Sequence, residues 1–196
     1  NIIREGLSNC IAQGGTATVE PGQIVANNYC YPDQTVGGEA LSLGDGFIDS
    51  IVIGNTIIDV TGSYYGMDFR NAFGATYQPQ RLVVANNVIR HTVSTAPGLR
   101  ALAPDSVYSG NIVTGNSNVA LLIAADNCTF VGNKLDVGTG TARAFQTSGS
   151  PLNILFDGSN QYAPFAWFDG SAGAATFRDG SSARFTSYPT AAAYLR

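Results

Sequence analysis

Hydrophobic residues in this chain gather in short runs that are separated by Gly, Asn, Ser or Asp. The clearest stretch covers residues 81–137, where no helical period is sustained over the roughly 11 to 18 residues that an amphipathic helix needs. Its predicted strands are residues 81–85, 88–91, 99–103, 107–109, 112–114, 119–123, 128–131 and 135–137. Short strands that repeat three to a cycle predict an all-β solenoid rather than a fold with helical crossovers.

Asparagine recurs at one phase of this cycle, next to a branched or long apolar residue. The recurring positions are Asn9, Asn28, Asn55, Asn87, Asn111, Asn133 and Asn160. Their spacing is typical of one supersecondary turn stacked on the next. Stacked asparagine side chains can hydrogen-bond along a column and tolerate a left-handed bend. We therefore predict a parallel β-helix of about six to seven rungs. An antiparallel sandwich is the alternative, but it gives asparagine no reason to recur at one phase.

The C-terminal part follows a shorter period. Phe-Asp-Gly-Ser at 156–159 and 168–171, and the related Phe-Arg-Asp-Gly-Ser at 177–181, each carry a strong turn signal between β segments. We expect the parallel β-helix to occupy residues 1–150, and residues 151–196 to form a last rung and a C-terminal β cap.

The composition of the chain limits the classes of partner that it could bind. Charged residues make up 12% of the chain, the net charge is −4 and there is no basic run, which argues against nucleic acid. No apolar stretch reaches the length of about 20 residues that a membrane span needs. Cys10 and Cys30 would pair in an oxidising compartment or pack as small hydrophobes. Because residues 1–4 offer no obvious cap, we consider the chain a piece of a longer protein, with trimming or signal removal as the alternative.

Over about residues 7 to 160, the ladder of turn asparagines resembles that of the right-handed parallel β-helix superfamily of pectate-lyase-like proteins. This superfamily includes polysaccharide lyases, glycoside hydrolases, alginate epimerases and the tailspike depolymerases of bacteriophages. The resemblance implies a sugar-binding groove on the third strand of each rung and the loop after it. In this sequence those strands are residues 39–42, 66–70, 98–102, 119–122 and 142–145.

Strand alternation then gives two outward columns on this face. The first is Asp68, Arg100, Ala120 and Arg143, and the second is Arg70, Leu102, Leu122 and Phe145. Asp68, Arg100 and Arg143 are the candidate catalytic residues, since arginines on a flat face suit acidic sugars. The resemblance implies a basic residue that takes the proton beside a uronate carboxylate. Arg100 would fill that role, and Asp68 would orient it or hold Ca²⁺. The alternative is an ordinary ion pair between adjacent rungs.

One further stretch bears on the chemistry. Tyr65-Gly66-Met67-Asp68 resembles the Tyr-Gly-x-Asp-Pro-His stretch of alginate epimerases. Phe69-Arg70 replaces Pro-His here, which removes the histidine of that family.

The remaining candidates would bind substrate. They are Arg70, Glu39, Asp45, Tyr77, Asp105, Leu102 and Phe145. Glu39, Asp45 and Asp105 could pair with Asp68 as the two carboxyls of a hydrolase, although turn capping is the alternative for Asp45. Tyr77 lies in a loop that would form a wall of the groove or pack back over the face of the β-helix. Leu102, Leu122 and Phe145 would form an apolar strip that binds sugar faces or a second subunit. The single histidine, His91, is expected to be structural.

The sequence thus predicts an extracellular, secreted or virion-surface protein that binds and cleaves a polysaccharide, with an acidic one favoured, by lyase or hydrolase chemistry. We expect no cofactor apart from the Ca²⁺ considered at Asp68. The alternative is a non-catalytic structural or adhesive segment of a trimeric spike or surface protein.

Overall fold

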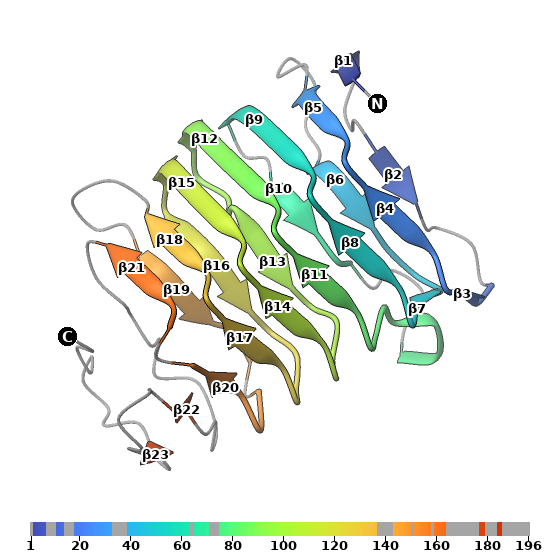
Figure 1. Cartoon of the computed structure of the whole chain (residues 1–196), viewed down its shortest axis with the longest axis vertical. Coiled ribbons are helices and arrows are strands. Elements are labelled where there is room, and N and C mark those ends of the chain that lie inside the picture. The colour runs from blue at the N-terminus through green and yellow to red at the C-terminus, as the bar shows by residue number, and fades with distance from the viewer. Residues whose placement is uncertain are drawn as a thin grey trace.

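The computed structural model describes residues 2–6, 11–13, 18–32, 39–62, 65–70, 75–136, 143–149, 151–157, 159–163, 177–178 and 184–185. Within these residues three long, all-parallel sheets form a β-solenoid, and the only helical segment is the short 3-10 turn η1 (Ala75–Tyr77). Figure 1 shows the strands of successive turns lying side by side from the N-terminal to the C-terminal end. The predicted fold class is confirmed, and the antiparallel sandwich is wrong.

Each turn of the solenoid contributes one strand to each sheet, in the order D, A, B. Sheet D contains β4 (Ile24–Ala26), β8 (Ile51–Ile53), β11 (Val83–Ala85), β14 (Val107–Ser109), β17 (Thr129–Val131) and β20 (Leu155–Phe156). Sheet A contains β1 (Ile2–Gly6), β5 (Tyr29–Pro32), β9 (Thr56–Gly62), β12 (Val88–Ser94), β15 (Ile112–Ser117), β18 (Lys134–Asp136) and β21 (Gln161–Ala163). Sheet B contains β2 (Ile11–Gln13), β6 (Glu39–Leu43), β10 (Tyr65–Asp68), β13 (Leu99–Ala101), β16 (Val119–Ile123) and β19 (Arg143–Thr147).

Two smaller pairs complete the described strands. Sheet C pairs β3 (Glu20–Pro21) with β7 (Phe47–Ile48) in parallel. Sheet E pairs β22 (Phe177–Arg178) with β23 (Arg184–Phe185) in antiparallel fashion. The domain boundary at residue 150 and the capping role of the C-terminal part stay predictions.

The expected six to seven rungs were slightly too many, since the described strands make five complete turns, each with one strand in sheets D, A and B. The outermost strands belong to incomplete turns. β1 and β2 have no described sheet D strand before them, and β20 and β21 have no described sheet B strand after them. The sequence count had taken every asparagine as the mark of a full rung.

The asparagine ladder stands at the corner between sheets D and A. In each pair of neighbouring turns, the side-chain amide and the backbone N–H of one asparagine both donate to Oδ1 of the next. The ladder joins Asn28, Asn55, Asn87, Asn111, Asn133 and Asn160, while Asn9 lies outside the described residues. From Asn55 onward, each side-chain amide also donates to a backbone carbonyl of the preceding turn. The predicted ladder is confirmed.

The residue before each of the first five ladder asparagines makes the bend. Asn27, Gly54, Asn86, Gly110 and Gly132 have φ between 53° and 66°. Only glycine and, at lower frequency, asparagine adopt this left-handed conformation without a large steric cost. The second corner, between sheets B and D, uses the same device at Asp49, Arg81, Asp105, Asn127 and Asn153. Two such bends in each turn return the chain to its starting edge.

The core is filled by one inward column from each sheet. Val25, Val52 and Val84 come from sheet D, where the column continues with an aromatic row. In that row the rings of Tyr108 and Phe130 stack with centroids 5.0 Å apart. Cys30 heads the inward column of sheet A and is disulfide-bonded, whereas Cys128 is a buried free thiol. Cys10 lies outside the described residues.

Candidate functional site

The outer face of sheet B is where the sequence placed a sugar-binding groove. The five expected strands do share this sheet, as β6, β10, β13, β16 and β19. Asp68 and Arg100 lie side by side on β10 and β13, as predicted. Arg100 is in register with Leu122, and Leu122 with Gln146. The outward column therefore reads Asp68, Arg100, Leu122, Gln146.

Four members of the predicted columns were misplaced. Ala120 is fully buried, and Leu122, predicted for the second column, takes its place beside Arg100. Arg143 is in register with Val119, at the start of the strand, and not with Arg100. Phe145 is in register with Leu121 and is fully buried, with its ring 4.7 Å from that of Phe156. The predicted apolar strip of Leu102, Leu122 and Phe145 is therefore wrong. Strict alternation fails because the chain turns a corner where β16 begins, so that Ala120 and Leu121 both face inward.

The corner is made by a column of small residues. Ala40, Gly66, Gly98, Ala120 and Ala144 occupy one level in successive turns and are all buried. A Cβ atom on Gly98 would lie 2.3 Å from Val113 Cγ1 and 2.9 Å from the carbonyl oxygen of Ala120. Sheets A and B approach too closely here for a larger side chain, and this fixes the register of the outer face.

Asp68 is the buried centre of the charged cluster on this face. Its side chain is fully buried, and Arg100 donates to both carboxylate oxygens, with Nε 2.6 Å from Oδ1 and Nη2 bound to Oδ2. This bidentate geometry is the strongest form of arginine–carboxylate pairing. The Arg100 guanidinium also lies over the Tyr65 ring, 4.1 Å from its centroid, where cation–π attraction adds to the pairing.

A second ion pair borders the first. Arg70 Nη2 is bound to Glu39 Oε2, and Arg70 Nε lies 3.9 Å from Asp68 Oδ2. Two arginines thus face two carboxylates, and the formal charge of Glu39, Asp68, Arg70 and Arg100 sums to zero. The arrangement is the inter-rung ion pair that the sequence offered as the alternative to a catalytic site.

The electrostatics of Arg100 oppose a role as a base. Burial lowers the pKa of its guanidinium, but the hydrogen bond that it donates to Asp68 and the charges of Asp68, Tyr65 and Glu39 raise the pKa, and the net shift is upward. Arg100 therefore stays protonated and cannot accept a proton in this environment. The Asp68 side chain is fully buried and both of its oxygens are bound to Arg100, and the Ca²⁺ considered at this residue stays a prediction.

The other predicted residues lie toward the corner between sheets B and D. Gly46 N–H donates to the carbonyl oxygen of Tyr77, which holds η1 against the turn containing buried Asp45. Leu102 is half-buried against the core, and its carbonyl oxygen accepts a bond from Gln78 Nε2. Asp105 is exposed, has φ of 55° and accepts a bond from Asn127 Nδ2. These residues do not join the Asp68–Arg100 cluster through any described contact.

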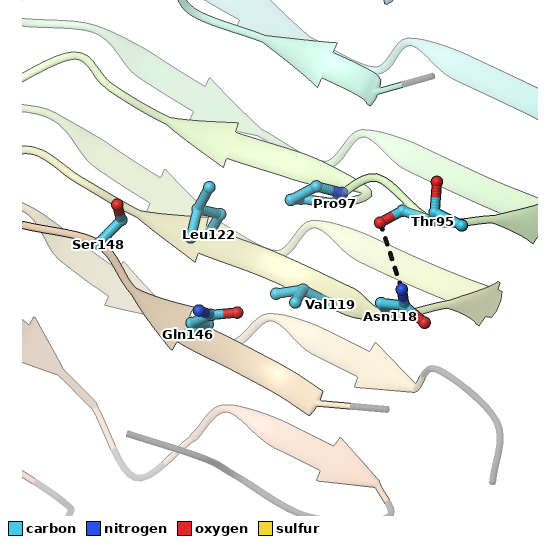
Figure 2. Close-up of a pocket in the computed structure, with 7 residues that line it drawn as sticks. All are labelled: Thr95, Pro97, Asn118, Val119, Leu122, Gln146 and Ser148. Atoms are coloured by element: carbon cyan, nitrogen blue, oxygen red, sulfur yellow. Dashed lines mark hydrogen bonds between the residues drawn. The ribbon is translucent and has the colours of Figure 1, made fainter. Parts of the chain in front are cut away.

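A groove of about 460 Å³ lies beside the charged cluster (Figure 2). It is lined by Thr95, Pro97, Asn118, Val119, Leu122, Gln146 and Ser148, from β16, β19, the links that precede β13 and β16, and the residue after β19. Figure 2 shows these side chains along one face, with Asn118 Nδ2 donating to the carbonyl oxygen of Thr95 at 3.4 Å. Leu122 connects the groove to Arg100, its neighbour in register.

Apart from Leu122, the sequence analysis did not propose the groove residues for a site, because none of them is charged. The column of small residues is the sequence signal from which the groove residues could have been predicted. Aligning Gly98 with Ala120 and Ala144 places Leu122 and Gln146 next to Arg100. With that register, the short polar residues before β13 and β16 fall at the same edge.

His91 is buried, and its two ring nitrogens have no hydrogen-bond partner among the described residues. Burial lowers its pKa to about 4, so the ring is neutral at pH 7. This position agrees with the structural role that the sequence indicated.

Among the described residues, no group of three or more His, Cys, Asp or Glu side chains is arranged to hold a metal ion. No helix in this part of the chain is long and apolar enough to cross a membrane. Comparisons with known proteins gave no match: no protein-family model, no curated protein and no solved structure is similar enough to assign a relationship.

Proposed function

We propose that this chain is an extracellular carbohydrate-binding β-solenoid that holds an extended, uncharged polysaccharide along the outer face of sheet B. The observation that carries this proposal is the lining of the groove. Three apolar side chains (Pro97, Val119 and Leu122) alternate with two amides and two hydroxyls (Thr95, Asn118, Gln146 and Ser148).

This lining suits a sugar chain because sugars present apolar ring faces and hydroxyl edges together. Binding sites for such ligands combine apolar surface with a few placed polar groups. The groove crosses three successive turns of the solenoid. With about 4.8 Å between neighbouring strands, that length is roughly 10 Å along the solenoid axis, enough for a short stretch of an extended chain.

The charged cluster favours an uncharged ligand over an acidic one. Arg70 and Arg100 are each already paired with a carboxylate, and a uronate would have to displace that carboxylate within a partly buried pair. Binding of an acidic polysaccharide, with cleavage centred on Asp68, Arg100 and Arg143, was our expectation from the resemblance to pectate-lyase-like proteins. Cleavage of an acidic polysaccharide stays a prediction, and the pairing of Asp68 with Arg100 favours binding without cleavage.

The test is a binding panel of neutral and acidic polysaccharides, measured by affinity electrophoresis and calorimetry at low and high salt. We expect retention on a neutral polymer that is insensitive to salt, because no net charge attracts the ligand. Replacing Gln146 with Ala should weaken binding about five- to tenfold, the value of one hydrogen bond of roughly 1 kcal/mol. The matched control is Gln161→Ala on sheet A, which should bind as the parent does.

Other results would redirect the proposal. Binding only to acidic polymers, lost at high salt and on replacing Arg100, would overturn the uncharged ligand. Release of new reducing ends or unsaturated uronates would show that the protein cleaves the polymer and would favour lyase or hydrolase chemistry.

The second candidate is a non-catalytic structural or adhesive rod. It is favoured by the unbroken ladder from Asn28 to Asn160, which makes a rigid spacer. Absence of binding to every polymer in the panel would favour this function.

A further inference from the structure

The groove on sheet B contains a small apolar depression. Val119 and Leu122 both line the groove, whereas the two residues between them, Ala120 and Leu121, face inward. Val119 and Leu122 therefore stand on opposite sides of the depression, about 10 Å apart along the strand. Pro97 lies on the Val119 side, one turn earlier (Figure 2). We name the space between these three apolar side chains the apolar notch.

The shape of the apolar notch suits a small rounded group better than the flat face of a sugar ring. A flat sugar face makes the most contacts with a flat aromatic ring, and none of the described residues that line the groove is aromatic. Tyr65 occupies the level of Pro97 one turn earlier, but the Arg100 guanidinium lies over its ring, 4.1 Å from the centroid. Branched and cyclic aliphatic side chains leave a concave gap instead, and a methyl group fills such a gap.

Amides stand next to the apolar notch. Gln146 is in register with Leu122 on the following strand, and Asn118 directly precedes Val119. A carboxamide carries two donor hydrogens and an acceptor oxygen, so it can pair with the N–H or the carbonyl of another amide. A bond within the protein, such as that from Asn118 Nδ2 to the carbonyl oxygen of Thr95, leaves further donor and acceptor sites on the same group. The lining thus places amide partners beside a methyl-sized apolar gap.

We infer that the groove recognises a polysaccharide containing 2-acetamido sugars, and that the acetamido group of one sugar enters the apolar notch. This inference rests on the proposed function and specifies the chemistry of its uncharged ligand. The acetyl methyl packs against Pro97, Val119 and Leu122. The amide of the same group bonds to the carboxamide of Gln146.

Other substituents at C2 fit the lining less well. A hydroxyl group leaves the apolar notch without an apolar partner. A free ammonium group brings an unpaired charge against apolar side chains, which costs free energy. The acetamido group has an apolar end and an uncharged amide end, and therefore matches both parts of the lining. The groove should distinguish sugars that share one ring and differ only at C2.

Matched sugar probes test this specificity by titration calorimetry at about 0.15 M salt, where long-range charge effects are screened. One set consists of β-1,4-linked tetramers of N-acetylglucosamine, glucose and glucosamine. The second set, the methyl glycosides of N-acetylgalactosamine and galactose, has the other configuration at C4. In at least one set the acetamido sugar should bind about tenfold more tightly than its hydroxyl counterpart, through burial of the methyl group and one amide hydrogen bond. The glucosamine tetramer should bind no better than the glucose tetramer.

A matched pair of variants assigns the preference to the apolar notch. Leu122→Ala removes one wall of the notch and should reduce the preference for the acetamido sugar about threefold or more, with little change for the hydroxyl sugar. Leu152→Ala is the control, because Leu152 is 44% exposed and lies in the link before β20, outside the groove lining. It should leave the preference unchanged. Far-UV spectra and melting temperatures check that both variants fold.

The possible failures separate this inference from the proposed function. Equal affinity for the acetamido and hydroxyl members of both sets would overturn the inference and leave an uncharged ligand in place. Retention on a neutral polymer without acetamido groups, with no binding of the acetamido probes, would do the same. If no neutral probe or polymer bound, the proposed function itself would fail. Equal preferences in Leu122→Ala and Leu152→Ala would overturn the assignment to the apolar notch.

Discussion

Removing one amide from the middle of the asparagine ladder should destabilise the whole solenoid. Asn111 is fully buried, and its side chain makes four hydrogen bonds. Oδ1 accepts from the backbone N–H and the side-chain amide of Asn87 at 3.1 and 2.9 Å. Nδ2 donates to the carbonyl oxygen of Val84 at 2.9 Å and to Asn133 Oδ1 at 3.0 Å. All four are lost in Asn111→Ala.

The size of the effect follows from what is left behind. Asn87 Nδ2 keeps the carbonyl oxygen of Val52, and Asn133 Oδ1 keeps the backbone N–H of Asn111. The backbone N–H of Asn87 loses the acceptor that Asn111 provided. Three of the lost bonds are worth about 1 kcal/mol each, and the buried backbone N–H of Asn87 left without a partner adds a penalty of about 1–3 kcal/mol, so Asn111→Ala should cost about 4–6 kcal/mol. Asn116→Ala, at an exposed position of β15, should cost less than about 0.5 kcal/mol.

Guanidinium unfolding followed by far-UV circular dichroism measures both variants. A stacked array can unfold in parts, so a second probe such as tyrosine fluorescence should give the same midpoint before a free energy is assigned. Asn111→Asp is a useful companion, because it keeps an oxygen at Oδ1 but removes both donated bonds. If Asn111→Ala were as stable as Asn116→Ala, the ladder would contribute nothing to the stability of the fold, and our account of the corner between sheets D and A would be wrong.

Three further predictions test the interior. Burial lowers the pKa of His91 to about 4 from an ordinary 6.5. Below pH 6.5 His91 therefore binds a proton in the unfolded state but not in the folded state. Up to about 3 kcal/mol of the free energy of unfolding is lost as the pH falls to 4. An imidazole titrating near 6.5 in the folded protein by NMR would contradict this. Asp68→Ala should cost about 3–5 kcal/mol, because it leaves Arg100 without its carboxylate in a partly buried site. A double-mutant cycle with Arg100→Ala should give a coupling above about 1 kcal/mol, and a coupling near zero would exclude the pair as a structural element. Gly98→Ala should cost about 1–3 kcal/mol through overpacking against Val113, whereas a thermal melt equal to that of the parent would show that the corner has room.

The fold could be predicted because its strongest constraint is local and repeated. Every turn must satisfy the same corner, and asparagine meets that need at Asn55, Asn87, Asn111 and Asn133 in the same way. The pairing of Asp68 with Arg100 could also be predicted, since each lies two residues after a glycine, Gly66 or Gly98, at the same level of sheet B.

The outer face beyond Arg100 could not be derived by counting residues. β16 begins two residues earlier relative to its neighbour than simple alternation assumes, because Leu121 and not Val119 pairs with Leu99. β19 differs by one further residue, because Arg143 pairs with Val119 and not with Ala120; this places Phe145 in register with Leu121, in the core. The groove was missed for a different reason. Its residues are uncharged, and only their gathering in three dimensions distinguishes them from ordinary turn residues.

The measurement that tests the ladder most directly is NMR scalar coupling across its hydrogen bonds, read from the backbone nitrogen of one asparagine to the side-chain carbonyl carbon of the next. The account predicts such couplings for five successive pairs from Asn28 to Asn160, together with slow hydrogen exchange at each side-chain amide. Side-chain amides that exchange as fast as those of exposed asparagines, with no coupling between turns, would contradict it.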